Sequence, residues 1–287
     1  MSKTAVIAVS TGCLDYLDVD RNNLFMVRCK ILMHDKQYND YTELDADTFY
    51  KALKEDTSLV PSSSMPSIGE IIETYEAVEA AGFSNVLVIS ISKGLSGTYE
   101  AGLMAKNAYK GNLNIWVIDS KNAAISEGFL SLLALKYIDQ GKSFKEIIKA
   151  IEDLRIKRKQ YFMVDNLRLF VKNGRLSSAQ GFIAGVLKIK PILEVNDQGK
   201  IVPFDKVRTQ SKAISRMAEL IINDVKELKN YVITYNTSDN LEAYESLREQ
   251  IESALPKHVA YAAPITPVIG CHTGHGTVGV AYFNLDE

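Results

Sequence analysis

The sequence Val86-Leu-Val-Ile-Ser-Ile-Ser-Lys-Gly-Leu-Ser-Gly-Thr98 joins an apolar run to a loop of small and hydroxyl residues, and a helical pattern continues over Thr98–Ala108. The run Val86–Ile91 is short and rich in β-branched residues, as expected of a strand covered on both faces. A strand, a tight loop and a helix in this order make up half of a βαβ unit. This stretch therefore predicts an α/β fold built on parallel strands.

The same alternation of short apolar runs and helical patterns extends along the chain. Ser67 and Glu70 form a capping-box pattern at the start of one such helix. Further strands are predicted at Ala5–Val9, Ile115–Ile118, Tyr161–Val164 and Tyr231–Tyr235. Further helices are predicted, from apolar residues at three- and four-residue spacing, over Asp47–Lys54, Ile68–Ala81, Glu127–Gln140, Ser143–Lys157, Ser211–Lys226 and Leu241–Ala254.

The basic stretch Arg155-Ile-Lys-Arg-Lys159 marks the predicted domain boundary. It closes a helical pattern, where cations complement the helix dipole, with a docking patch as the alternative. Residues 1–158 are expected to form an α/β domain with a mostly parallel sheet. Residues 159–287 are expected to form a mixed α+β domain, because Ile192–Val195 and Lys200–Phe204 flank a turn-rich tetrapeptide typical of an antiparallel hairpin.

Composition limits the classes of function. The 287 residues include 33 Lys and Arg against 35 Asp and Glu, so the net charge of −2 disfavours a nucleic-acid partner. A hydrophobic fraction of 46% with 24% charged residues is typical of a packed globular protein. No apolar run is long enough to span a membrane, and the first ten residues do not read as a signal peptide. We therefore expect a cytoplasmic protein without integral membrane association.

Loops that follow predicted strands are the best candidates for a binding site, because open α/β sheets bind ligands at the carboxyl ends of their strands. Ser10-Thr-Gly12 and Ser92–Thr98 are such loops, and Ser62-Ser-Ser-Met-Pro-Ser67 precedes a predicted helix. Each alone is more typical of a helix cap than of a ligand site. Neither a phosphate-binding loop nor a dinucleotide fingerprint is present. The shared hydroxyl donors favour one small carboxylate or phosphate.

The segment Gly270-Cys-His-Thr-Gly-His-Gly276 is predicted to be a glycine-rich turn. A metal site is disfavoured because the segment holds no Asp or Glu, and Cys13, Cys29 and Cys271 show neither zinc nor disulfide spacing. Ser96 with His272 as general base would suit an acyl hydrolase or transferase, although the spacing around Ser96 does not match a nucleophile elbow. A hydroxyl contact to a bound carboxylate would explain the same residues.

Seven motifs occur in order over nearly the whole chain. They are Ser63-Ser-Met-Pro-Ser67, Ser92-Lys-Gly-Leu-Ser-Gly-Thr-Tyr99, Val117-Ile-Asp-Ser120, Lys172-Asn-Gly-Arg-Leu-Ser177, Leu187-Lys-Ile-Lys-Pro-Ile-Leu193, Lys206-Val-Arg208 and Gly270-Cys-His-Thr-Gly274. Together they resemble the DegV family of fatty-acid-binding proteins. The resemblance implies a two-domain α/β fold that holds one long-chain fatty acid, of the palmitate, stearate or oleate class, in a tunnel between or beneath the domains. Some bacterial members of the family are the acyl-carrying subunit of a fatty acid kinase.

Carried over residue by residue, the resemblance implies a carboxylate site made by Ser63, Ser96 and His272, with Ser64 as the alternative to Ser63. It implies supporting roles for loop residues, namely Ser10, Thr11, Gly97, Thr98 and Gly270. Arg175 and Arg208 match basic positions associated with partner docking or phosphoryl transfer. No cofactor or metal is expected, and the ligand is a long-chain fatty acid. We expect a non-catalytic carrier in lipid metabolism, and the alternative is a serine-dependent acyl hydrolase or transferase.

The chain departs from the usual family pattern at several positions. Val9 and Cys13 replace two acidic residues of the opening motif, which puts any role of those acids in doubt. Ser63 replaces the commoner threonine and keeps its hydroxyl. Asn173 stands where glycine is usual, and His275 where proline is usual. The hydroxyl positions and His272 are retained, so the expectation of binding is stronger than that of a particular partner.

Overall fold

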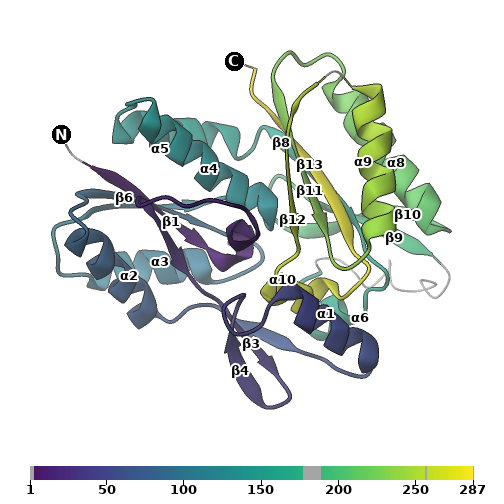
Figure 1. The fold of residues 1–287 in the computed structure, drawn as a ribbon, viewed down its shortest axis with the longest axis horizontal. Helices are drawn as coiled ribbons and strands as arrows, with labels where there is room; N and C mark the ends of the chain where they lie inside the picture. Colours follow the sequence, from purple (N-terminus) through teal and green to yellow (C-terminus); the bar gives the residue numbers. More distant parts are fainter. Residues whose placement is uncertain (1–2, 177–188, 256, 287) are drawn as a thin grey trace.

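A computed structural model describes residues 3–176, 189–255 and 257–286. The first of two large sheets is parallel, as the sequence predicts, and has the strand order β2-β1-β6-β7 (Figure 1). Its strands are β1 (Thr4–Val9), β2 (Leu24–Val27), β6 (Asn85–Ser90) and β7 (Asn114–Asp119). The sequence analysis identified all of these strands except β2.

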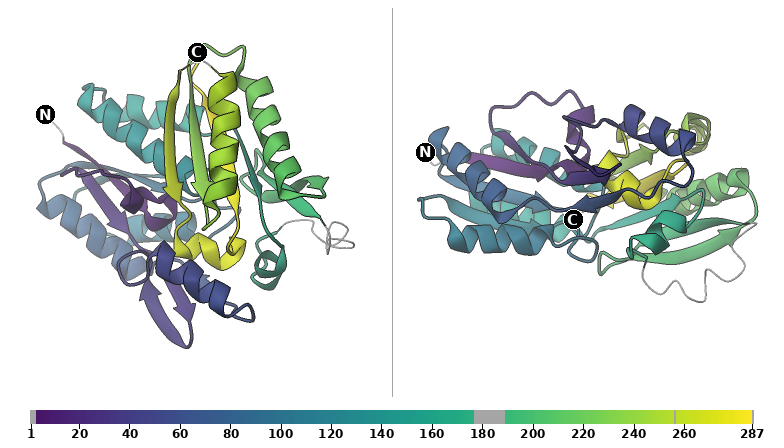
Figure 2. Two further views of the ribbon diagram at one scale, coloured as in Figure 1. Left: turned by 45° about the vertical axis from the view of Figure 1, so that its right-hand side comes forward. Right: turned by 90° about the horizontal axis from the view of Figure 1, so that it is seen from below.

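Helices cover both faces of the parallel sheet, which explains why its strands are almost continuously apolar. Alternate residues of β1 and β6 pack against opposite layers: Ile7 and Val88 against one pair of helices, and Val6 and Leu87 against the other. The helices are α2 (Ile68–Ala80) and α3 (Thr98–Ala108) on one face, and α4 (Ile125–Asp139) and α5 (Phe144–Leu154) on the other (Figure 2). Ser67 and Glu70 form the predicted capping box of α2.

The second large sheet is mixed, with the strand order β10-β9-β8-β13-β11-β12. Among its pairs, β11 with β12 is parallel and the others are antiparallel, including the predicted β9–β10 hairpin. One face packs against α8 (Gln210–Val225) and α9 (Leu241–Ala254). The strands are β8 (Arg158–Met163), β9 (Lys190–Val195), β10 (Ile201–Val207), β11 (Tyr231–Thr237), β12 (Val259–Pro264) and β13 (Val278–Asn284).

A third, small sheet joins the two halves of the chain. Its strands β4-β3-β5 are antiparallel, and it lies beside helices from both ends of the sequence (Figure 1). A shared core contains Ile31 and Phe49 from the first half and Leu169, Val268 and Cys271 from the second. The elements are β3 (Lys30–Met33), β4 (Lys36–Asn39), β5 (Ser62–Ser64), α1 (Ala46–Glu55), α6 (Arg168–Lys172) and α10 (Pro267–Thr273).

Three local expectations were wrong. The Ser62–Ser67 loop begins as a strand, β5, because Ser62–Ser64 pairs with β3. The predicted Gly270–Gly276 turn is helical as far as Thr273. Pro267 lies at the start of α10, where its missing N–H group would have no partner within the helix in any case. The helix predicted to reach Lys157 ends at Leu154, and Arg158 opens β8 instead.

The side chain of Arg158 is buried and connects the two large sheets. It is 4% exposed, and its guanidinium donates to Val195 O at 2.7 Å and Asn196 O at 3.0 Å in the second sheet's hairpin. It also donates to Lys121 O at 2.7 Å and Asn122 Oδ1 at 2.9 Å after β7. Arg158 is therefore neither a helix-end cation nor part of a docking patch. The domain boundary at residue 158 stays a prediction.

Some expectations concern residues at the limits of what the structure covers. The motif residues Ser177, Leu187 and Lys188 lie outside the described residues. Within the described ranges, no helix is long and apolar enough to cross a membrane. In the same ranges, no group of three or more His, Cys, Asp or Glu side chains could hold a metal ion.

Candidate functional site

A cavity of about 80 Å³ lies at the carboxyl ends of β1 and β6, where α10 and the β9–β10 hairpin meet the parallel sheet. It contains most of the polar residues that the sequence analysis singled out. The lining consists of Thr11, Cys29, Ser63, Ser64, Met65, Ile91, Leu95, Ser96, Ala123, Phe170, Arg175, Ile201, Val268, Ile269, His272 and Thr273. Five hydroxyl residues, one imidazole and one guanidinium thus line a mostly apolar cavity.

Ser63 and His272 form the polar centre of this cavity. Ser63 lies on β5 and His272 in the last turn of α10, and their Oγ and Nε2 atoms are 2.7 Å apart. Burial lowers the pKa of His272 to about 4, and the positive charge of Arg175 adds to the effect. His272 is therefore neutral near pH 7. If its Nε2 carries the proton, Ser63 accepts that hydrogen bond and its own hydroxyl proton can be donated to a ligand.

Ser96 reaches the cavity from the loop between β6 and α3. Its Oγ lies 2.8 Å from Thr98 Oγ1 and accepts a bond from Thr98 N at 3.3 Å. Ser92 anchors this loop to the β9–β10 turn, because its Oγ donates to Gly199 O at 2.8 Å. The sequence-predicted partners Ser96 and His272 share the cavity, but the hydrogen bond of His272 goes to Ser63.

Thr11 and Ser10 lie in a 3₁₀ turn, η1 (Ser10–Gly12), directly after β1. Thr11 lines the cavity and donates to Glu127 Oε1 at 2.8 Å. Burial raises the pKa of Glu127 well above its usual range, so this carboxyl group favours its protonated form. Ser10 is not among the lining residues, and its Oγ accepts a bond from Cys29 N at 3.2 Å. Thr11 is therefore a cavity residue, whereas Ser10 ties η1 to the segment before β3.

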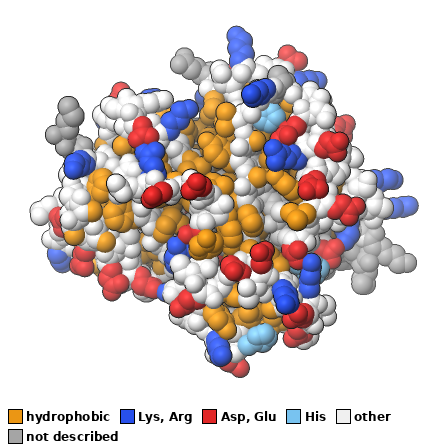
Figure 3. Space-filling model, in the orientation of Figure 1, with side chains coloured by type: hydrophobic (Ala, Val, Ile, Leu, Met, Phe, Trp, Pro, Cys, Tyr) orange, Lys and Arg blue, Asp and Glu red, His pale blue; other side chains and the backbone are white. Residues whose placement is uncertain are grey.

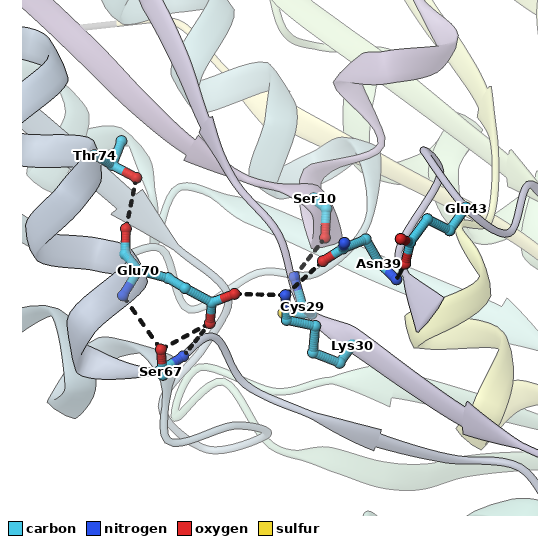
Figure 4. Close-up of polar contacts among 8 residues, drawn as sticks. All are labelled: Ser10, Cys29, Lys30, Asn39, Glu43, Ser67, Glu70 and Thr74. Atoms are coloured by element: carbon cyan, nitrogen blue, oxygen red, sulfur yellow. Dashed lines mark hydrogen bonds and ion pairs between the residues drawn. The ribbon is translucent and has the colours of Figure 1, made fainter. Parts of the chain in front are cut away.

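Polar contacts anchor the start of α2 to the small sheet (Figure 4). Ser67 Oγ accepts from Glu70 N, and Glu70 Oε2 accepts from Ser67 N at 2.9 Å. The other oxygen of Glu70 forms an ion pair with Lys30 on β3, which also donates to Asn39 Oδ1. These contacts hold the start of α2 against the small sheet and so fix the strand that presents Ser63.

Buried polar contacts also position α10. Asp40 Oδ1 accepts from Thr266 Oγ1 at 2.7 Å and from Val268 N at 3.2 Å, at the start of the helix. Burial raises the pKa of Asp40 to about 6, although the bond from Thr266 opposes the shift. Asn173 donates to Pro61 O at 3.1 Å and Cys271 O at 2.7 Å. This asparagine, which stands where the family usually has glycine, thus connects α6, β5 and α10.

Gly97, beside Ser96, and Gly270, near His272, permit close packing. A Cβ atom at Gly270 would lie 2.6 Å from the ring of Phe49 and 2.7 Å from Tyr50 Oη, so only glycine lets α10 approach α1. A Cβ atom at Gly97 would lie 3.0 Å from Met65 Sδ beside the cavity. Both predicted supporting glycines therefore lie at tight contacts.

The two arginines occupy different places. Arg175 lines the cavity, is exposed, and donates to Asn173 O at 2.7 Å. Arg208 is exposed just beyond β10, whereas Ile201 at the other end of that strand touches the cavity. At about 3.3 Å per residue, the seven-residue strand separates Arg208 from the cavity by roughly 20 Å. Arg175 is thus near the head of the site and Arg208 is not.

A second cavity of about 50 Å³ lies next to the first, and Ala123, Ile201, Ile269 and Thr273 line both. It runs between the start of α4 and the inner face of the mixed sheet. Its remaining lining is Ala124, Gln160, Phe162, Val195, Asn236, Ile265, Thr277 and Gly279. The first cavity therefore has a smaller, mostly apolar cavity beside it.

A larger hollow on the outside holds none of the predicted site residues. It measures about 430 Å³ and lies between α4 and β12, with Leu132, Leu133 and Tyr261 in its wall. Figure 3 shows hydrophobic side chains along the middle of this face, where the two large sheets meet. The smaller pair of cavities, which includes the predicted site residues in its lining, is therefore the better candidate site.

Sequence reasoning missed the apolar lining of the site. Phe170 comes from α6, which was not predicted, and Val268 and Ile269 come from the part of α10 that precedes the segment expected to be a turn. Cys29 was seen only as an unpaired thiol. Pro267 at a helix start was the one local signal that could have indicated α10.

Comparisons with known proteins agree with the fold and the motifs. A family model described as "Uncharacterised protein, DegV family" matches residues 3–285. Protein DegV of Bacillus subtilis (strain 168) is 34% identical over 282 residues, covering 97% of this chain and 98% of that protein. A Listeria innocua protein named for its DegV domain is 32% identical over 283 residues, covering 98% of each.

Solved structures give the same result. The crystal structure of DegV from Bacillus subtilis, described as a fatty acid binding protein, superposes with a TM-score of 0.89 at 31% identity, covering 99% of this chain and 100% of that one. A DegV family protein from Thermus thermophilus, described by its fatty acid binding, gives 0.90 at 25% identity, with the same two coverages. The chain described here belongs to the DegV family and has its two-sheet α/β fold.

Proposed function

We propose that this protein binds one long-chain fatty acid, with the carboxylate at Ser63, Ser96 and His272 and the tail in the second cavity. The observation that supports this most strongly is that these side chains, from β5, the β6–α3 loop and α10, line one mostly apolar cavity beside a second apolar cavity. Relatives from Bacillus subtilis and Thermus thermophilus are described as fatty acid binding, which supports the same ligand class.

The head of the site suits a carboxylate held mainly by neutral donors. Ser63 and Ser96 each offer a hydroxyl, and His272 is neutral because burial lowers its pKa to about 4. Hydrogen bonds to a charged group contribute about 1.5–3 kcal/mol each. Arg175 at the edge adds one positive charge, which offsets the charge of the ligand.

The tail would supply most of the affinity. Each buried methylene contributes about 0.8 kcal/mol before the cost of association is subtracted. A buried water needs about 10–15 Å³ of free volume. The two cavities of about 80 and 50 Å³ therefore accommodate roughly ten groups of that size. A chain of sixteen or eighteen carbons would displace lining side chains or extend towards the mouth.

We further propose that the protein is a non-catalytic carrier that presents the carboxylate to a partner such as a fatty acid kinase. Arg175 supports this, because an exposed guanidinium beside the carboxylate could contact a partner's active site or a phosphoryl group. Arg208 remains a candidate for partner docking, but it lies away from the cavity and would contact a different part of the partner from Arg175.

Native mass spectrometry of the protein purified from cells tests the ligand. We expect a bound mass of a sixteen- or eighteen-carbon fatty acid, and rebinding of palmitate after delipidation. Ser63→Ala should weaken palmitate binding, whereas Ser246→Ala, on the exposed side of α9, should not. A cavity that is consistently empty and also refuses palmitate would refute the proposal.

The alternative activity is acyl hydrolysis or transfer by a serine. The bond between Ser63 and His272 is the observation in its favour, and it involves Ser63 instead of the predicted Ser96. His272 Nδ1 is buried and has no hydrogen-bond partner among the described residues, so no acid there orients the imidazole as in a triad. Turnover of an acyl ester that disappears in Ser63→Ala or Ser96→Ala would favour the enzyme.

A further inference from the structure

We propose that Asn173 is a positioning residue of the candidate site, because its side chain fixes Ser63 and His272 relative to each other so that both can meet one carboxylate. Asn173 is not among the residues that line the cavity, so it acts through its neighbours. The inference rests on the proposed function, in which Ser63 and His272 bind the head of a fatty acid.

The side-chain amide of Asn173 bridges the two segments that carry this pair. Its Nδ2 donates to Pro61 O at 3.1 Å and to Cys271 O at 2.7 Å. Both partners are carbonyl oxygens, which can only accept, so they assign the nitrogen side of the amide. Pro61 lies two residues before Ser63, and Cys271 directly precedes His272. One amide nitrogen thus uses both of its hydrogens to hold the two backbones together beside the pair.

Few other hydrogen bonds fix the separation of β5 and α10. Cys271 Sγ lies 3.5 Å from Ser62 O, and a thiol is a weak donor. Among the described residues, the other hydrogen bond between the two elements is that of Ser63 with His272. The carbonyl of Cys271 lies in the last turn of α10, where the helix itself offers no N–H partner. Asn173 therefore supplies a donor that this helix end lacks.

Asn173 is itself held in place by α6, which it directly follows. Its backbone N donates to Leu169 O at 2.9 Å, and Phe170 on the same helix is 0% exposed and belongs to a hydrophobic core. At the start of α6, Arg168 donates to Thr57 O at 2.6 Å, in the segment that leads to β5. The helix therefore contacts that segment at both ends and gives the amide of Asn173 a fixed base.

Holding the pair in place before the ligand arrives raises the affinity for a carboxylate. A polar side chain that becomes ordered only on binding weakens affinity by about two- to tenfold. Hydrogen bonds to a charged group are short and directional, so the carboxylate depends on the placement of both side chains. The hydrocarbon tail has no such requirement, because apolar burial is non-directional. Loss of the amide should therefore weaken the contribution of the head and leave that of the tail unchanged.

Displacement of cis-parinaric acid, a fluorescent fatty acid, from the delipidated full chain tests this inference. The competitors are laurate and 1-dodecanol, which share a twelve-carbon chain and differ only in the head group, and palmitate is added as a longer acid. In the wild type, laurate should bind about tenfold more tightly than dodecanol, because hydrogen bonds to a charged group are stronger than those to a neutral one.

Asn173→Leu removes both donors and keeps a side chain of similar size and shape. Laurate should bind this variant about two- to tenfold more weakly, while dodecanol affinity stays within about twofold and shows that the variant is folded. Asn173→Ala should give the same result without a side chain that has to fit. Both variants keep the backbone bond from Arg175 to residue 173. Asn223→Leu, on the exposed side of α8, is the matched control and should leave both affinities unchanged.

Either of two results would overturn the inference. One is an equal weakening of laurate and dodecanol in both Asn173 variants, as expected if the side chain only supports the fold. The other is an unchanged affinity for laurate. In both cases the wild type still binds fatty acids and the proposed function stands. A wild type that binds neither cis-parinaric acid nor palmitate would instead refute the proposed function, and this inference with it.

Discussion

Replacing Arg158 by methionine should destabilise this protein by about 3 kcal/mol. The guanidinium makes four hydrogen bonds of 2.7–3.0 Å that join the segment after β7 to the β9–β10 hairpin. Methionine keeps the packing of the stem but leaves three backbone carbonyls and Asn122 Oδ1 without their donor. Each buried polar atom left unpaired costs about 1–3 kcal/mol.

Part of this loss is offset, because the charge no longer has to be buried. Burial lowers the pKa of Arg158, which reflects the cost of keeping its charge away from water. Water can also reach some of the freed carbonyls at the hairpin. The net loss in the free energy of unfolding should therefore be about 3 kcal/mol, at the upper end of ordinary point mutations.

Urea denaturation followed by circular dichroism measures this loss. The matched control is Lys159→Met, which removes the neighbouring side chain on β8. Lys159 is half exposed and lies 4.0 Å from Asp197, so its ion pair should contribute less than about 1 kcal/mol. If Arg158→Met costs no more than Lys159→Met, the two large sheets are not held together by this guanidinium.

Three further predictions concern the site and its frame. Ser63→Ala should weaken palmitate binding by roughly ten- to a hundredfold in calorimetry, the loss of one hydrogen bond to a charged group; an unchanged affinity would remove Ser63 from the carboxylate site. His272 has a lowered pKa, so it stabilises the fold above pH 6.5 and this contribution is lost as the pH falls towards about 4. Urea titrations at several pH values should show that the free energy of unfolding falls less towards acid pH in His272→Gln than in the wild type. An equal fall in both proteins would contradict the lowered pKa of His272. Asp40 behaves in the opposite sense, because burial raises its pKa from 3.8 to about 6. Its contribution to the free energy of unfolding is therefore present below pH 3.8 and is lost as the pH rises through about 6. The variant Asp40→Asn should not show this loss. If the free energy of unfolding depends on pH in the same way in the wild type and in Asp40→Asn over that range, the raised pKa of Asp40 is refuted.

The elements that could be predicted are those with a strong local pattern. Helices α3 and α9 have the bounds expected from their apolar spacing. An amphipathic segment of this kind forms a helix wherever its apolar face can pack against a sheet. Strands β12 and β13 were missed: half of the residues of Val259–Pro264, at a sheet edge, are alanine, and Val278–Asn284 has a glycine as its second residue. Their strand character depends on pairing with β11, which a short window of sequence does not contain.

The candidate site residues were expected from the hydroxyl-rich loops and from the family resemblance, without their geometry. The hydroxyl loops after β1 and β6 could be located because parallel strands bring their carboxyl ends to one edge. Ser63 and Ser96 were expected together with His272, but the bond from His272 to Ser63 was not expected. The roles of Asn173 and Arg158 as connectors could not be foreseen, because each depends on backbone carbonyls from distant segments.

The sequence by itself determined the α/β class, the parallel and mixed sheets, most helices, and the motifs that indicate a DegV family member. These features depend on patterns within about fifteen residues, where periodicity and capping act directly. Only the tertiary structure decided which side chains meet. Ser63 and His272 are 209 positions apart, and they come into contact because β5 pairs with β3 while Gly270 lets α10 pack closely on α1. Contacts of this kind arise from the packing of whole elements around a shared core, and no local stretch of sequence contains them.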